Sequence, residues 1–189
     1  MSTKILTSRF EKGLVYATQL HQNQVRKGSD VPYISHLLSV AALVLEDGGD
    51  EDQAIAALLH DAIEDQGGDK IRQEIKTLFG EKVTNIVNGC TDSEILPKPP
   101  WHERKQQYIQ KMRFASPEVR RVSLADKLHN LRSILADYHR GEKDIWQKFT
   151  GGKDGSLWYY RSLIKVCQQK GSSYLVEECD RLVKQLEKL

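Results

Sequence analysis

Four polar side chains follow an apolar helical segment and place one imidazole close to three carboxylates. They are His60, Asp61, Glu64 and Asp65, which come directly after the run Ala-Ala-Leu-Leu. On a helix, residues four apart share a face, so His60 would lie above Glu64 and Asp61 above Asp65. Imidazole nitrogen together with carboxylate oxygen suits Mn, Fe or Mg better than a thiolate-preferring metal. Because the helix macrodipole disfavours acids at a C-terminus, this cluster at an expected helix end favours a functional role over a solvated surface.

Side chains from other parts of the chain are candidates to complete this cluster. Asp126 lies within an apolar helical run, where an unpaired carboxylate would be costly, so a metal or a neighbour such as Lys127 must satisfy it. Asn130 follows one turn later on the same side, and His129 is the main rival as a ligand. His36 begins an apolar segment, where a lone histidine is more often a satisfied core residue than a metal ligand.

A pair of cations, Arg26 and Lys27, follows the first expected helix and precedes Gly28. Arginine can bind a phosphate through its planar fork and lysine through its point charge. A basic helix C-terminus that complements the macrodipole is an equally good explanation from composition alone. The pair is therefore a candidate phosphate site with a structural alternative.

These side chains need helices to position them, and helical periodicity runs through most of the chain. The proline-rich segment 91–100 predicts a loop, because proline removes a backbone donor and disfavours helical geometry in the residue before it. Ser116 followed by Pro117 predicts the start of a long helix that carries Asp126. No segment alternates with period two for long enough to predict a strand, so the fold class is all-α. The other expected helices are 2–24, 33–45, one that starts near 50 and ends at 67, 71–79, 82–89, 101–114, 156–169 and 173–188.

Length and composition indicate a single domain over residues 1–189 and exclude several classes of protein. Of the 189 residues, 39% are hydrophobic and 29% charged, which suits one core without disulfides. A formal net charge of +2 excludes a nucleic-acid binder driven by bulk charge, so an anionic ligand needs a local cluster of cations. No stretch approaches the roughly 20 apolar residues of a membrane span, and the N-terminus lacks the features of a signal peptide. Three widely spaced cysteines without a C-x-x-C pair favour a reducing cytoplasmic location.

The order His36, His60-Asp61, Asp126 resembles the metal-binding pattern of the HD superfamily of phosphohydrolases. A longer series of motifs resembles the hydrolase domain of the RelA/SpoT alarmone enzymes, and most closely the stand-alone hydrolases of the metazoan SpoT-homologue kind. The series covers about residues 10–165 in order, and the C-terminal helix, 171–189, adds nothing to it. Its motifs are His21-x-x-Gln24-x-Arg26-Lys27, Tyr33-Ile34-x-His36, Ala57-Leu58-Leu59-His60-Asp61-x-x-Glu64-Asp65, Phe79-Gly80, Cys90-Thr91-Asp92 and Leu124-Ala125-Asp126-Lys127-Leu128-His129-Asn130-Leu131.

The resemblance implies a single HD-type fold of about eight to ten helices and a hydrolase that removes the 3′-pyrophosphate of ppGpp and pppGpp. It implies one Mn²⁺ ion, or another divalent metal, with four ligands: His36, His60, Asp61 and Asp126. Glu64 and Asp65 match the catalytic acidic pair that handles the nucleophilic water. The implied substrate-binding residues are Arg26, Lys27, Lys98 and Asn130. The partner is then a small nucleotide, with no nucleic acid and no membrane, and the oligomeric state stays open.

Three departures from the family pattern bear on the substrate rather than on the metal ligands. Leu37 stands where proline usually follows the ligand histidine, and Gln66 stands where threonine usually follows the acidic pair. The region 146–160 also differs from the characterised enzymes. Three alternatives stay open: an HD phosphohydrolase acting on another nucleotide, a non-catalytic nucleotide-binding HD module, and an oxygenase on an HD scaffold, which would need a second metal and more histidine ligands.

Overall fold

The computed structural model describes residues 6–93, 97–141 and 144–189 of the chain. These residues form ten α-helices and one short 3-10 helix, and the pairing of Val25 with Pro32 is an isolated bridge rather than part of a sheet. The predicted all-α fold class is therefore confirmed. That residues 1–189 make up a single domain stays a prediction. None of the described helices is long and apolar enough to cross a membrane.

The helices follow one another with short connections. In chain order they are α1 (Ser8–Leu20), α2 (Ile34–Glu46), α3 (Glu51–Leu59), α4 (Ala62–Gln66), α5 (Gly68–Phe79), α6 (Glu81–Cys90), α7 (Trp101–Phe114), α8 (Pro117–His139), the 3-10 helix η1 (Ile145–Lys148), α9 (Gly152–Gln168) and α10 (Tyr174–Leu186).

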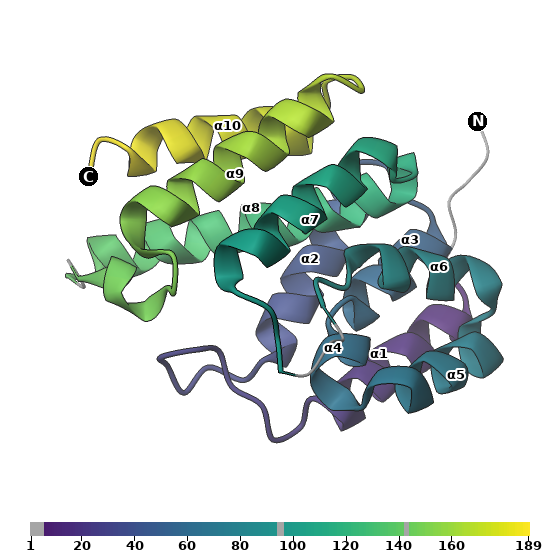
Figure 1. The fold of residues 1–189 in the computed structure, drawn as a ribbon. Coiled ribbons are helices and arrows are strands. Elements are labelled where there is room, and N and C mark those ends of the chain that lie inside the picture. The colour runs from purple at the N-terminus through teal and green to yellow at the C-terminus, as the bar shows by residue number, and fades with distance from the viewer. Residues whose placement is uncertain (1–5, 94–96, 142–143) are drawn as a thin grey trace.

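Three helices make up the centre of the fold, because α2, α3 and α8 each pack against the other two. α1 and α6 also pack on α3, α10 packs along α8, and α7 packs on α9 (Figure 1). Leu37, Leu58 and Leu128 lie at this centre with no exposed surface. Burial of a leucine side chain contributes about 1.5–3 kcal/mol, so the three central helices give firm support to any side chain at their ends.

Local chemistry explains where several helices begin. The Ser116 side chain accepts a hydrogen bond from the backbone N–H of Val119, and Pro117 occupies the first turn of α8. This is the start that the Ser-Pro sequence predicted. Asp50 caps α3 in the same way, through the backbone N–H of Gln53. Both caps satisfy amide groups that a helix start leaves without a partner.

The helix predicted from about residue 50 to 67 is wrong in one respect that matters for the site. α3 ends at Leu59 and α4 begins at Ala62, so His60 and Asp61 lie between two helices. Glu64 and Asp65 then fall in the first turn of α4 rather than at a helix end. Negative charge is favourable at a helix start, so the argument that these acids break the macrodipole rule does not hold.

Other boundaries differ less. The first helix is shorter than the predicted 2–24, since α1 runs from Ser8 to Leu20, and residues 1–5 lie outside the described residues. α9 starts at Gly152 instead of residue 156, and the Trp101 ring of α7 lies close to Gly151 and Gly155 at this helix start. Of the predicted loop 91–100, residues 94–96 lie outside the described residues, and the rest has no helix.

Candidate functional site

The four predicted metal ligands come together at the centre of the fold. His36 lies in the first turn of α2, His60 and Asp61 follow α3, and Asp126 lies near the middle of α8. His36, His60 and Asp126 are buried, and each offers one ligand atom within 4.8 Å of the others. Asp61 Oδ2 lies 3.0 Å from His60 Nε2 and 3.8 Å from His36 Nε2. Three donor atoms thus share one small volume, and the Asp61 carboxylate lies beside the two histidine nitrogens.

His60 shows whether these residues fit a metal. Its Nδ1 lies 2.8 Å from the backbone oxygen of Ala57, so Nδ1 carries the proton and donates it to that carbonyl. Its Nε2 is buried without a hydrogen-bond partner among the described groups, yet it faces the carboxylates of Asp61 and Asp126. A backbone carbonyl on one ring nitrogen, with the other ring nitrogen directed at carboxylates, is the usual arrangement of a metal-ligating histidine. The donor set therefore fits a divalent metal.

The electrostatics of this cluster call for positive charge. Burial opposes ionisation of His60, but the carboxylates of Asp61 and Asp126 outweigh burial and raise its pKa to about 9. For His36 the burial effect dominates, and its pKa is lowered. Without a metal, a proton on His60 offsets the negative charge of the two carboxylates. A divalent cation between the four side chains would supply that positive charge instead.

His129 lies behind His36 rather than among the four ligand atoms. The Nδ1 atoms of the two histidines are 2.8 Å apart, so one of them donates a hydrogen bond to the other. Burial, followed by the nearby His36 and Arg26, lowers the pKa of His129 to about 4, which leaves it neutral. With Nδ1 of His36 as the donor, Nε2 of His36 is left free for a metal. The structure thus places the predicted rival in an outer position.

Asp126 and Asn130 connect the cluster to the predicted phosphate-binding cations. Asn130 Nδ2 donates to Asp126 Oδ1 at 2.6 Å, and Asn130 Oδ1 accepts from Arg26 at 2.6 Å. Lys127 forms an ion pair with Asp126 Oδ2. The Arg26 guanidinium also lies 5.6 Å above the ring of Tyr33, whose hydroxyl donates to Asp61 Oδ2 at 2.5 Å. One hydrogen-bonded chain therefore runs from Arg26 to the candidate metal ligands.

Glu64 and Asp65 line the same cavity as His36, Asp61 and Asp126. Glu64 Oε1 accepts from Lys98 Nζ at 2.5 Å, and Glu64 Oε2 accepts from the backbone N–H of Asp92 at 3.1 Å. Burial raises the pKa of Asp65, the hydrogen bond from Gln24 opposes this rise, and the charges of Asp61 and Glu64 add to it. A carboxylate held beside a metal site and biased toward proton uptake has the properties of a general base.

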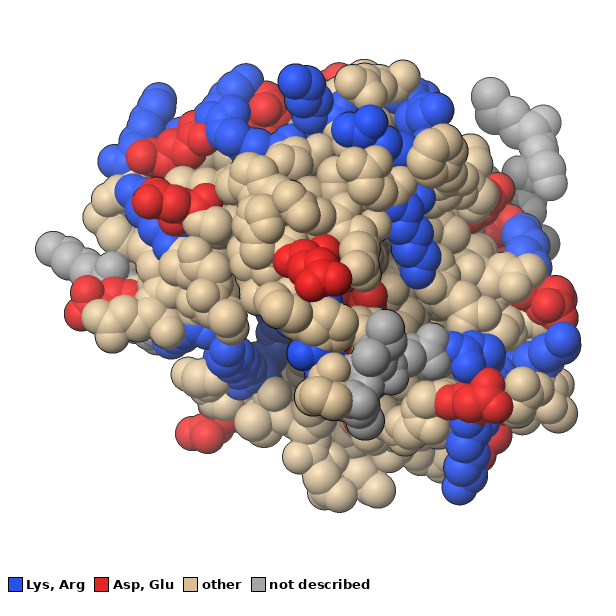
Figure 2. Space-filling view, in the orientation of Figure 1, with Lys and Arg blue, Asp and Glu red and all other residues tan. Residues whose placement is uncertain are grey.

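The cavity has a second compartment that the sequence did not indicate. The compartment with the candidate ligands measures about 250 Å³, and an adjoining one of about 220 Å³ shares four lining residues with it: Lys105, Lys127, Asn130 and Tyr159. Lys27 lines the second compartment, together with aromatic residues from α7, α9 and the segment between η1 and α9. Figure 2 shows Lys and Arg side chains around a hollow on this face of the molecule. Lys105 and Tyr159 lie outside the motifs, and the sequence analysis singled out region 146–160 only as a departure from the family pattern.

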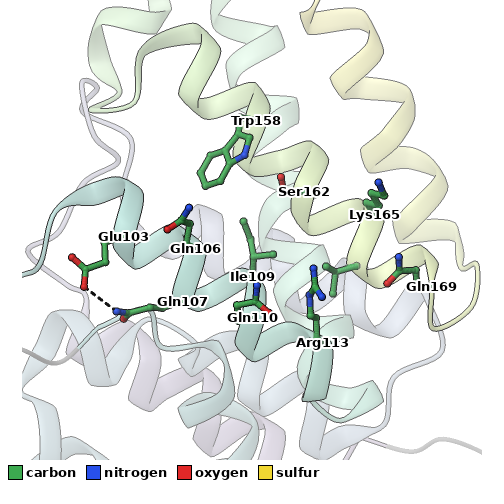
Figure 3. Close-up of a pocket in the computed structure, with 11 residues that line it drawn as sticks. Glu103, Gln106, Gln107, Ile109, Gln110, Arg113, Trp158, Ser162, Lys165 and Gln169 are labelled. Atoms are coloured by element: carbon green, nitrogen blue, oxygen red, sulfur yellow. Dashed lines mark hydrogen bonds between the residues drawn. The ribbon is translucent and has the colours of Figure 1, made fainter.

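A hollow larger than either compartment lies elsewhere. A groove of about 800 Å³ runs between α7 and α9, with Trp158 near one end and Arg113 and Lys165 further along (Figure 3). None of the predicted site residues lines it, and its described lining has one carboxylate, that of Glu103, and no histidine. Size alone therefore does not identify the functional site of this protein.

Comparisons with known proteins agree with this geometry. Residues 13–157 match the family model of the HD domain. The guanosine-3′,5′-bis(diphosphate) 3′-pyrophosphohydrolase MESH1 of Xenopus tropicalis is 41% identical over 122 residues, which are 63% of this chain and 65% of that protein. The human MESH1 is 38% identical over the same shares of both chains. GTP pyrophosphokinase rsh of Brucella melitensis is 40% identical over 126 residues, which are 65% of this chain and 16% of that protein.

Solved structures share the fold. A metazoan orthologue of SpoT, described as hydrolysing ppGpp, superposes with a TM-score of 0.76 at 24% identity, over 97% of this chain and 98% of its own. A protein of Listeria monocytogenes EGD-e superposes with a TM-score of 0.72 at 30% identity, over 82% of this chain and 99% of its own. In sequence, the chain spans 65% of the length of the MESH1 relatives.

Proposed function

The chain belongs to the HD-domain family, and from this premise we propose that it is a metal-dependent phosphohydrolase which removes the 3′-pyrophosphate of ppGpp and pppGpp. The names of the MESH1 relatives support this substrate. The observation that carries the proposal is the buried Nε2 of His60, which lies 3.0 Å from Asp61 Oδ2 and 3.8 Å from Asp126 Oδ1, beside the acidic pair Glu64 and Asp65. We take Mn²⁺ as the ion, as the resemblance to the alarmone hydrolases implies, and the mixed imidazole and carboxylate donors are compatible with it. The unpaired state of Cys90, Cys167 and Cys179 supports a reducing, cytoplasmic location.

His36, His60, Asp61 and Asp126 would hold the ion, which would supply Lewis-acid chemistry and lower the pKa of a water molecule. Asp65 accepts a proton from the attacking water, and Glu64, paired with Lys98, orients it. Lys105 and Lys127 stabilise the charge that accumulates on the departing pyrophosphate. The products are pyrophosphate and guanosine 5′-di- or triphosphate.

A nucleotide panel tests the proposal directly. The purified protein with Mn²⁺ is incubated with ppGpp, pppGpp, dNTPs and other nucleotides, and products are resolved by anion-exchange chromatography. We expect ppGpp to yield GDP and pyrophosphate. Hydrolysis of a different nucleotide alone would refute the alarmone substrate but not the phosphohydrolase class. Binding of nucleotides without any cleavage by a metal-loaded protein would instead identify a non-catalytic module.

A further inference from the structure

The side chain of Gln24 joins the turn after α1 to the short helix α4. Gln24 Nε2 donates a hydrogen bond to Asp65 Oδ2 at 2.9 Å. Gln24 Oε1 lies 2.6 Å from Gln66 Nε2 and 2.7 Å from His21 Nδ1. One amide thus contacts three side chains, and the two from α4 are adjacent in sequence.

These contacts permit one orientation of the Gln24 amide. If the amide were flipped, its oxygen would face the Asp65 carboxylate, which can only accept, so that contact would become repulsive. With Nε2 toward Asp65, the oxygen accepts one hydrogen bond from Gln66 and one from His21 Nδ1. His21 is itself fixed, because it is 2% exposed and stacks on the Tyr33 ring at 5.3 Å.

Asp65 needs a fixed partner because its surroundings repel it. The charges of Asp61 and Glu64 act on Asp65 from the same cavity, and α4 has only five residues to hold it. Glu64 is paired with a cation, Lys98, whereas Asp65 accepts its hydrogen bond from a neutral amide. A neutral donor fixes the position of a carboxylate without competing for its proton as strongly as a cation would.

We propose that Gln24 is a positioning residue that fixes the Asp65 carboxylate for proton transfer, and that Gln66 acts through Gln24 by locking its amide. The proposal rests on the proposed function, in which Asp65 receives the proton of the attacking water. It also gives a role to Gln66, the residue at which the sequence departs from the family pattern. Neither glutamine is a catalytic residue here, because Asp65 lies between Gln24 and the reacting atoms.

The test compares Gln24→Met, Gln66→Met and the double variant as Mn²⁺-loaded proteins acting on ppGpp. Methionine keeps the length of the side chain and removes its hydrogen bonds. We expect Gln24→Met to lower kcat about tenfold, as loss of a hydrogen bond to a charged group does, with KM and bound metal unchanged. Gln66→Met should lower kcat about threefold, and the double variant should match Gln24→Met, because residues acting in series are not additive. Gln22→Met, at an exposed position in the same turn, should match the wild type.

Three results would overturn the proposal. A raised KM at constant kcat would mean that Gln24 contacts substrate, and effects that multiply in the double variant would mean that Gln66 acts independently. A Gln24→Met protein with unchanged kcat would remove the positioning role altogether. Melting curves of each variant separate these results from loss of fold.

Failure of the proposed function gives a different result. In that case the wild type leaves ppGpp intact, and crystal structures of the Mn²⁺-loaded wild type and Gln24→Met then decide the positioning role alone. We expect one Asp65 side-chain conformation bonded to Gln24 in the wild type and a displaced or multiple conformation in the variant. An unchanged Asp65 in Gln24→Met would overturn the proposal whatever the substrate.

Discussion

Replacement of His129 by phenylalanine tests whether His36 is prepared to bind a metal. The Nδ1 atoms of these histidines are 2.8 Å apart, and their ring centroids are 4.8 Å apart. Phenylalanine keeps a ring against His36 but offers no nitrogen to accept its proton. The change therefore removes one hydrogen bond and little of the packing.

The cost should fall on the metal-bound state. Without a metal, His36 in the variant can move its proton to Nε2, which lies 3.3 Å from Asp126 Oδ1, and keep a hydrogen bond. A metal needs the Nε2 lone pair, so it returns the proton to Nδ1, which then has no acceptor. A buried donor without a partner costs about 1–3 kcal/mol, and about 1.4 kcal/mol is a tenfold change in an equilibrium constant. We therefore expect the dissociation constant for Mn²⁺ to rise about 5- to 150-fold. Loss of a hydrogen-bond partner of a metal ligand usually lowers metal affinity by a factor within this range.

Competition with a chromophoric chelator measures this constant in the absence of any substrate. His139→Phe is the matched control, because His139 is exposed near the end of α8 and its ring contacts Tyr138. A folded His129→Phe protein with wild-type metal affinity would refute the reasoning. The free energy of unfolding of the metal-free protein is measured as well. If His129→Phe lowers it by as much as it lowers the free energy of metal binding, His129 supports the fold rather than the ligand.

Four further substitutions probe the site and its support. Asp65→Asn should keep the metal and lower kcat about 10²–10⁴-fold, the range for a positioned acid–base group, because Asp65 accepts the proton in the proposed reaction. His60→Ala should instead lose metal and activity together. Metal analysis beside kinetics separates the two results. Arg26→Ala should raise KM for ppGpp about tenfold without loss of metal, because a charged hydrogen-bond donor is lost. The control Lys12→Ala, at an exposed position, should change neither KM nor bound metal. Gly151→Ala should lower the free energy of unfolding in urea by about 1–3 kcal/mol, since its Cβ would lie 2.6 Å from the Trp101 ring.

Helix starts could be predicted from the sequence because their causes are local. The cap at Ser116 involves an amide three residues away, and the geometry of Pro117 suits the first turn of any helix. The break between α3 and α4 had no such signal. His60 and Asp61 keep nearly helical backbone angles, and neither glycine nor proline marks the boundary.

The site was predictable to the extent that its residues fall in short motifs. The four candidate ligands were named from such motifs, and they lie together in the structure. The contact between Arg26 and Asn130 joins residues 104 positions apart, and that between His36 and His129 joins residues 93 apart. A single sequence carries no spacing rule for such pairs, because the path of the chain between them sets the distance. Lys105 and Tyr159 were missed for the same reason.

The distribution of charge in the cavity explains how a nearly neutral chain can serve an anionic substrate. Five carboxylates line the compartment with the candidate ligands, against two lysines, Lys105 and Lys127. The adjoining compartment has Lys27 together with the same two lysines, and no carboxylate among its described lining residues. The first compartment repels a polyphosphate until a divalent ion offsets its carboxylates, whereas the second attracts one at any time. In the proposed reaction the substrate carries phosphates on both sides of its ribose. The compartment with the candidate ligands would bind the 3′-pyrophosphate, which is cleaved, once a metal is present. The adjoining compartment would bind the 5′-phosphates, which stay on the nucleoside.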